Sequence, residues 1–158
     1  MSQTTNPSDP ISFRSITPHL VCVGADKAID FYSNAFGMKE IMRLPGPDGR
    51  LMHASMSFGD SMIMLAEAFP EYGSVGPQPG TPSPVSIHLN VPNVDEVFAQ
   101  AVATGAKVVM PVDDMFWGDR YGIVEDPFGH RWSIATRTKD LSHEEVQKAM
   151  VDFTKPCD

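Results

Sequence analysis

Two histidines occupy matching places in a repeated part of the chain. His19 is followed by Leu20, and the same pair returns as His88 and Leu89. Imidazole can bind a metal, exchange hydrogen bonds with a ligand, or act as acid and base near neutral pH. His19 and His88 are therefore the candidate catalytic residues. The competing interpretation is that duplication copied a packed histidine whose nitrogens bond to backbone or water.

Three further side chains are candidates for ligand binding. His53 lies in a predicted strand and has a weaker claim than the repeated histidines. Trp117 and Tyr121 belong to an aromatic segment, and flat rings with a polar edge suit the mouth of a pocket. The alternative is a loop that buries its aromatic rings to anchor itself. Asp119 and Arg120 beside them are interpreted as a local ion pair.

The repeat extends beyond the histidines and predicts the same order of elements in each half. Each copy reads as a strand, a helix ended by glycine, and three more strands. The predicted strands of the first copy span 16–23, 39–44, 51–58 and 61–66, and those of the second span 84–91, 107–111, 121–125 and 131–136. The predicted helices lie between Asp26 and Gly37 and from about Val94 to Thr104.

This order of elements predicts an α+β fold of two tandem βαβββ modules, each too small to bury an adequate core alone. Prolines and glycines between the modules favour an extended connection without regular structure. After the second module, Ser142 and Glu145 are spaced as a capping box and predict a last helix. The predicted segments are a flexible tail (1–12), a first module (13–67), a linker (68–83), a second module (84–137), and a C-terminal helix and tail (138–158).

Charge and composition argue against several classes of partner. The formal net charge of −8 disfavours nucleic acid and anionic membranes, because both attract basic surfaces. No segment approaches the roughly 18 apolar residues of a membrane span, and the N-terminus lacks a signal-peptide pattern. Cys22 and Cys157 are too few for a disulfide framework, so reduced thiols and a cytoplasmic location are expected.

Several motifs resemble the vicinal oxygen chelate superfamily, which holds glyoxalase I, extradiol dioxygenases and bleomycin or fosfomycin resistance proteins. They are AIDFY in the first predicted helix, GDSMIML, and VEDPFGHRW. The segments MHA, WGDRYG and DPFGHRWSIAT resemble its PhnB-like, glyoxalase-like branch. The resemblance implies curved, barrel-like mixed sheets, usually completed in a homodimer, whose concave faces line a small-molecule pocket.

In metal-using members of that superfamily, the first strand of a module gives one ligand, usually histidine, and a last strand gives a carboxylate. The resemblance places Ser133 and Met64 at the two carboxylate positions. It places Ser86 at the first-strand position of the second module, with His88 two residues further and on the same face. In the first module this position falls just before His19.

The sequence thus keeps the motifs of the superfamily's fold but lacks the carboxylates that its metal-using members have at the ligand positions. Hydroxyl and thioether groups are poor ligands for Mg, Mn, Zn or Fe(II). No cofactor is expected, although a divalent metal, if bound, would be held by His19 and His88 together with water. The candidate ligand-binding residues are His53, Met64, Ser86, Trp117, Tyr121 and Ser133.

Three functions of different class follow from these observations. The leading one is a glyoxalase-like or bleomycin-resistance-like protein with a concave small-molecule pocket, acting as a binder or a metal-independent enzyme. The second is a divalent-metal-dependent lyase, isomerase or dioxygenase using His19 and His88. The third is a dimeric scaffold without small-molecule chemistry. A homodimer is expected because a second copy can complete open strand edges.

Overall fold

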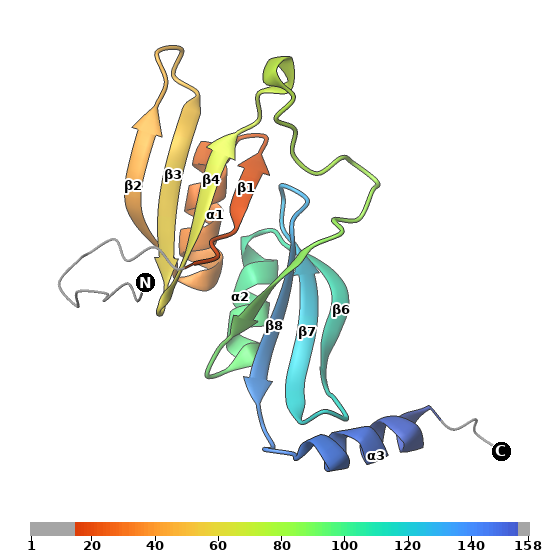
Figure 1. The fold of residues 1–158 in the computed structure, drawn as a ribbon. Coiled ribbons are helices and arrows are strands. Elements are labelled where there is room, and N and C mark those ends of the chain that lie inside the picture. Colours follow the sequence, from red (N-terminus) through yellow and green to blue (C-terminus); the bar gives the residue numbers. More distant parts are fainter. Residues whose placement is uncertain (1–14, 155–158) are drawn as a thin grey trace, which may run out of the picture. The chain divides into compact units, whose positions relative to one another are not determined.

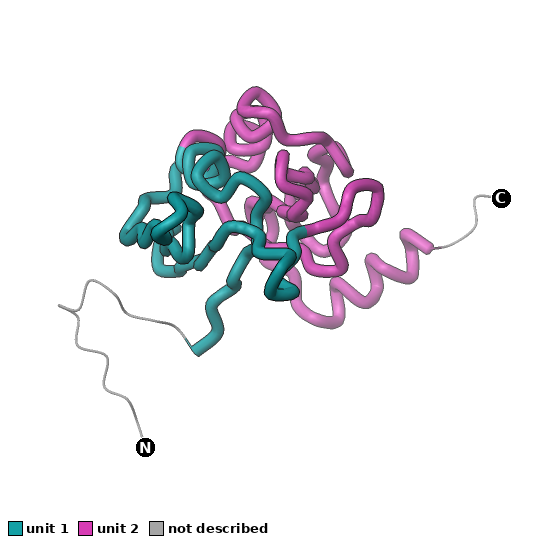
Figure 2. The backbone as a smooth tube through the Cα atoms, turned by 90° about the horizontal axis from the view of Figure 1, so that it is seen from above, with its two compact units in different colours: residues 1–33, 37–76 teal, residues 34–36, 77–158 magenta. Residues whose placement is uncertain are grey.

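Each half of the sequence forms one four-stranded mixed sheet with a helix against it (Figure 1). The computed structural model describes residues 15–154. The chain divides into two compact units, one made of residues 1–33 and 37–76 and the other of residues 34–36 and 77–158 (Figure 2). The predicted α+β fold of two βαβββ modules is confirmed.

Unit 1 has the strand order β1-β4-β3-β2, in which β1 and β4 are parallel and the other neighbours are antiparallel. A helix follows β1, as the parallel pairing requires, because the chain must return to the same end of the sheet before β4 can pair. The elements are β1 (His19–Cys22), α1 (Ala25–Phe36), β2 (Lys39–Pro45), β3 (Leu51–Phe58) and β4 (Ser61–Glu67).

Unit 2 repeats this arrangement with the order β5-β8-β7-β6 and a parallel β5–β8 pair. Both sheets are open: β1 and β2 are the edges of one, and β5 and β6 the edges of the other. The elements are β5 (Ser86–Asn90), α2 (Val94–Thr104), β6 (Lys107–Asp114), β7 (Asp119–Glu125) and β8 (Arg131–Arg137).

Alternation along the strands separates a packed face from an open face in unit 1. Leu20, Leu65 and Ala54 are register partners across three strands, and all three are buried. On the same side, Ile29 and Tyr32 of α1 are 2% and 0% exposed. Burial of one large apolar side chain contributes about 1.5–3 kcal/mol, so this face carries the core and leaves the other face for chemistry.

Helix α1 begins without a side-chain cap of its own. Its N-cap is Gly24, which has a φ of 88°. The carboxylate of Glu67, at the end of β4, accepts hydrogen bonds from the backbone N–H groups of Gly24 at 2.9 Å and Ala25 at 2.8 Å. These donors have no partner within the helix, and the negative charge also suits the positive end of the helix dipole.

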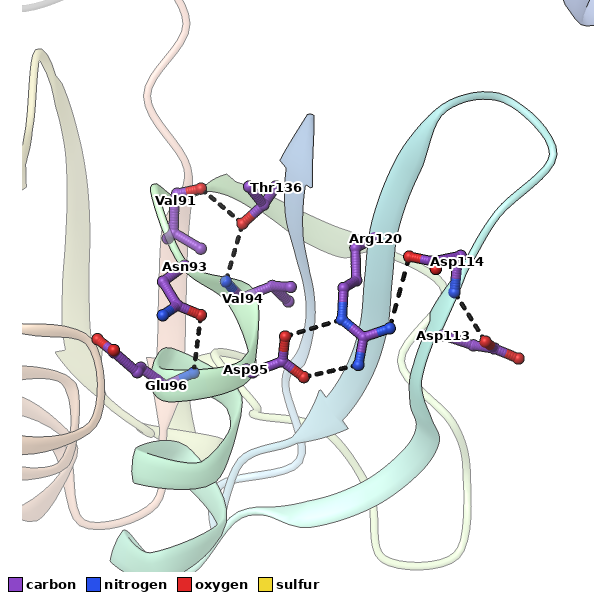
Figure 3. Close-up of polar contacts among 9 residues, drawn as sticks. All are labelled: Val91, Asn93, Val94, Asp95, Glu96, Asp113, Asp114, Arg120 and Thr136. Atoms are coloured by element: carbon purple, nitrogen blue, oxygen red, sulfur yellow. Dashed lines mark hydrogen bonds and ion pairs between the residues drawn. The ribbon is translucent and has the colours of Figure 1, made fainter. Parts of the chain in front are cut away.

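Thr136 takes the equivalent place in unit 2, as Figure 3 shows. Its hydroxyl oxygen accepts a hydrogen bond from the N–H of Val94 at 2.8 Å and donates one to the carbonyl of Val91 at 2.8 Å. The side chain of Asn93, the N-cap residue of α2, accepts a hydrogen bond from the N–H of Glu96 at 3.4 Å. In both modules, therefore, the last strand holds the start of the helix.

The predicted local ion pair between Asp119 and Arg120 is wrong. Successive residues of a strand point to opposite faces, so the two side chains diverge. The guanidinium of Arg120 donates two hydrogen bonds of 2.8 Å to Asp95, in the first turn of α2, and lies 3.5 Å from Asp114 (Figure 3). Asp119 instead accepts a hydrogen bond from Arg137 on the other face.

The linker prediction also needs correction, because part of the Pro/Gly-rich segment has regular structure. Pro70–Tyr72 forms a short 3₁₀ helix, and Phe69 and Ser74 form a β-bridge around it. Proline suits the first position of a helical turn, since its φ is already fixed and its missing N–H would have no partner there.

Strand β6 is longer than predicted and continues through Pro111 to Asp114. Its pairing with β7 is irregular between Met110 and Asp113. Because β6 is an edge strand, proline is tolerated there without breaking the pairing of an inner strand.

The predicted last helix is confirmed as α3 (His143–Phe153). Ser142 and Glu145 form the complete capping box that their spacing indicates. No helix in residues 15–154 has the length and apolar character needed to cross a membrane.

Replacing Glu67 with alanine tests the tie between β4 and α1. The variant should lose about 1–2 kcal/mol of unfolding free energy, as for loss of a helix cap. Urea denaturation measures the change. Asp140→Ala is the control, since it removes an equal charge at an exposed position. Equal unfolding midpoints for the two variants would refute the role given to Glu67.

Candidate functional site

The open face of unit 2 carries most of the predicted site residues. Register partners across β5 and β8 share a face, so Ser86, His88 and Asn90 lie beside Arg131, Ser133 and Ala135, respectively. Ser86, His88 and Asn90 are all exposed. His88 and Ser86 thus share one face, as their spacing predicts, and this face is called the His88 face below.

Both ring nitrogens of His88 are engaged in hydrogen bonds. Nδ1 lies 2.8 Å from the hydroxyl of Ser133, and Nε2 lies 3.2 Å from the amide oxygen of Asn90. An amide oxygen only accepts, so Nε2 donates, and in the neutral ring Nδ1 accepts the proton of the serine hydroxyl. Ser133 is only 4% exposed, so the exposed ring of His88 is hydrogen-bonded to a buried hydroxyl.

Asn90 was not predicted from the sequence, although one signal was present. It continues the alternation that relates Ser86 to His88 along the same strand. A polar residue at the next position of an exposed face is common, and only the side-chain geometry distinguishes a partner of His88 from a solvated residue.

Aromatic rings extend the His88 face toward the start of β7. Tyr121 stacks on His88 with ring centroids 6.1 Å apart and an angle of 22°. Trp117 meets Tyr121 edge-on at 5.5 Å, and Phe116 meets Trp117 at 5.0 Å. Phe153 of α3 lies 5.3 Å from Phe116. A row of rings therefore connects the last helix with His88.

Asp119 fixes the tryptophan in this row. It is 9% exposed, and its carboxylate accepts a hydrogen bond from Nε1 of Trp117 at 3.0 Å. Arg137 donates to the other carboxylate oxygen. The aromatic loop is thus anchored by its own side chains, which agrees with the anchoring interpretation, while its contact with Tyr121 keeps Trp117 beside the His88 face.

Unit 1 repeats the layout with different side chains. His19 pairs in register with Met64, as His88 pairs with Ser133. The ring of His53 lies edge-on to His19 at 5.9 Å, and Nε2 of His53 is 3.2 Å from the hydroxyl of Ser55. The structure thus brings His19, His53 and Met64 together.

The environment of His19 lowers its pKa below the ordinary value of 6.5. Partial burial is the larger cause, and the charge on His53 is the second. Both disfavour the protonated ring, so protonation of His19 requires a lower pH than that of an unperturbed imidazole.

The two βαβββ modules agree with comparisons to known proteins. A family model described as the Glyoxalase/Bleomycin resistance protein/Dioxygenase superfamily matches residues 16–134. The chain belongs to this superfamily. An uncharacterised protein of Mycobacterium bovis is 43% identical over 139 residues, covering 86% of this chain and 91% of the relative.

Solved structures show the same fold. The crystal structure of TioX from Micromonospora sp. ML1 has a TM-score of 0.63 and 27% identity, covering 79% of this chain and 99% of that one. A PhnB protein from Bacillus cereus has a TM-score of 0.61 and 18% identity, covering 78% of this chain and 99% of that one. The likeness to this PhnB protein shows that the two chains share a fold.

The donor groups on the open faces do not fit a divalent metal. The side chain beside His19 is a thioether, and the one beside His88 is a hydroxyl, neither of which is a good ligand for hard divalent ions. Glu67 lies on the other face and holds α1. Within residues 15–154, no three His, Cys, Asp or Glu side chains are grouped to hold a metal.

A cavity of about 410 Å³ lies elsewhere in unit 1, beside the turn between β2 and β3. Its charged groups are already paired: Arg50 lies 2.7 Å from Glu71 and 4.2 Å from the centre of the Phe69 ring. None of the predicted site residues lines it. We therefore place the candidate site on the histidine-bearing faces. The cavity is lined by Pro47, Asp48, Arg50, Met52, Phe69, Tyr72 and Ser74.

The pKa of His19 can be tested by NMR titration of its ring protons. Its midpoint should lie below 6.5, and His53→Phe should raise it, because the neighbouring charge is removed while burial remains. A histidine with a lowered folded-state pKa binds fewer protons when folded, so the stability it contributes falls as the pH drops through 6.5 toward the folded value. Tyr72→Phe, an exposed change in the same unit, is the control. A midpoint unaffected by His53→Phe would contradict the coupling.

Proposed function

We propose that this protein binds a small organic molecule on the His88 face and does so without a metal. The observation that carries the proposal is the chain of hydrogen bonds from Ser133 through His88 to Asn90. It fixes the orientation of an exposed imidazole, and fixed orientation lowers the entropy that binding would otherwise cost. Membership of the superfamily supports a small-molecule role in general terms.

The surroundings of His88 suit a ligand with both polar and apolar parts. Tyr121 and Trp117 offer flat rings next to the imidazole, and Ile123 is the register partner of Ser133 in β7. Binding sites for small molecules commonly combine apolar and aromatic walls with a few placed polar groups. His88 supplies the polar group here, toward an oxygen-bearing ligand.

The proposal includes the matching face of unit 1. His19, His53 and Met64 give it two imidazoles and a flexible thioether, a softer and more apolar set than Ser133 and Asn90 provide. Thioethers adapt to varied apolar shapes. The lowered pKa of His19 favours the neutral ring, whose unprotonated nitrogen can accept a hydrogen bond. A cytoplasmic location remains a prediction.

The binding proposal is tested by titrating catechol, S-hexylglutathione and bleomycin into metal-free protein, followed by two-dimensional NMR. At least one probe should shift the resonances of the His88 face. His88→Phe keeps a flat ring against Tyr121 but removes both nitrogens, so affinity should fall about tenfold or more. His143→Gln, an exposed histidine change, is the control.

Elemental analysis and metal titration test the metal-dependent alternative in the same protein. Treatment with EDTA should leave probe affinity unchanged, and added Ni, Mn, Zn or Co should not raise the melting temperature. A stoichiometric metal that is lost in His88→Ala would overturn the metal-free proposal and favour a metal-dependent lyase, isomerase or dioxygenase. Absence of binding by every probe would favour the scaffold.

We also propose that the protein is a homodimer. The edge strands β2 and β6 expose Leu44, Val108 and Val109, and an unpaired edge with apolar side chains favours pairing with another chain. Sedimentation velocity at micromolar concentration should give the mass of a dimer. A monomer at this concentration would contradict the proposal.

A further inference from the structure

One end of the His88 face carries a row of polar and charged residues. Ser86, Arg131 and Glu125 are register partners across β5, β8 and β7, and Lys107 of β6 follows Glu125. This row lies two residues along the strands from His88 and Ser133. Two strand residues span about 7 Å, so one small molecule can reach both rows.

Arg131 differs from the other paired arginines of the chain. The guanidinium of Arg50 lies 2.7 Å from Glu71, and that of Arg120 lies 2.8 Å from Asp95. Nε of Arg131, by contrast, is buried and has no hydrogen-bond partner among the described residues. Glu125 approaches it only to 4.0 Å, which is beyond hydrogen-bond length.

A buried N–H group without an acceptor is rare in folded proteins and points to a missing partner. The side chain of Arg131 as a whole is 27% exposed and that of Glu125 is 28% exposed, so the pair is open to solvent on one side. The guanidinium is a planar fork that matches a carboxylate through two parallel hydrogen bonds. An incoming carboxylate can therefore take the position that Glu125 approaches but does not fill.

We propose that Arg131 anchors the carboxylate of the ligand, so that the His88 face recognises small carboxylic acids. This inference rests on the function proposed above and specifies its substrate class. The ligand carries a second oxygen roughly 7 Å from its carboxylate, at His88, with an apolar part between the two. Because the chain has a net charge of −8, anion binding depends on this local cation and not on the overall field.

The nearby carboxylate of Glu125 opposes the binding of an acid at Arg131. It competes with the ligand for Arg131 and repels a bound anion, since it lies 4.0 Å from Nε. Removing its charge should therefore strengthen binding of acids, whereas removing the charge of Arg131 should weaken it. If Arg131 and Glu125 only stabilised the fold as a pair, removing either charge would change acid affinity in the same direction.

The test compares 4-hydroxyphenylacetate with its neutral amide, 4-hydroxyphenylacetamide, by NMR titration of metal-free protein. The wild type should bind the acid about tenfold or more tightly than the amide. Arg131→Gln should abolish this preference by weakening acid binding far more than amide binding, and Arg131→Lys should retain part of it because the charge is kept without the fork. Glu125→Gln should strengthen acid binding about two- to fivefold.

Lys148→Gln, which removes one positive charge from an exposed position on α3, is the matched control and should change neither affinity. Equal affinity of the wild type for acid and amide would overturn the carboxylate anchor, as would binding of neither probe. Loss of acid binding in His88→Phe but not in Arg131→Gln or Arg131→Lys would also overturn the anchor while leaving the proposed function intact. The spectra of the free variants establish that each one is folded.

Discussion

Parallel pairing of the first and last strand of each module determines which side chains can act together. It brings His19 beside Met64 and His88 beside Ser133, although each pair is far apart in sequence. Parallel strands need a crossover, and the helix that provides it must start at a defined place on the sheet. The bonds from Glu67 and Thr136 to the helix N-termini hold that place. These bonds stabilise the start of each helix beside the strand that carries Met64 or Ser133.

The two modules share this frame but differ in chemistry. On the open face of unit 1, the imidazoles of His19 and His53 meet beside a thioether. On the open face of unit 2, one imidazole is held between a hydroxyl and an amide and is flanked by Tyr121. The same strand order therefore presents two imidazoles and a thioether in unit 1, and an imidazole with a fixed orientation in unit 2.

Local sequence signals predicted the elements well because their causes are local. Glycine ended both helices, and the Ser142 and Glu145 spacing predicted the cap of α3. Contacts that depend on strand register were not accessible in the same way. Arg137 holds Asp119 through the pairing of β7 with β8. Asn90 is only two residues from His88, but their spacing alone does not show that the two side chains are hydrogen-bonded. The linker turn at Pro70–Tyr72 was missed because proline was interpreted only as a breaker.

The alternation within β4 and β8 also bears on how such a protein can diversify. Met64 and Ser133 face the open side, Leu65 and Ile134 are buried in the core, and Glu67 and Thr136 hold the helices. Positions that determine chemistry are thus interleaved with positions that determine stability, without being shared. After duplication, single substitutions on the open face of one copy can change its chemistry without altering the residues that form its core. This is a physical reason for one scaffold to have acquired many activities.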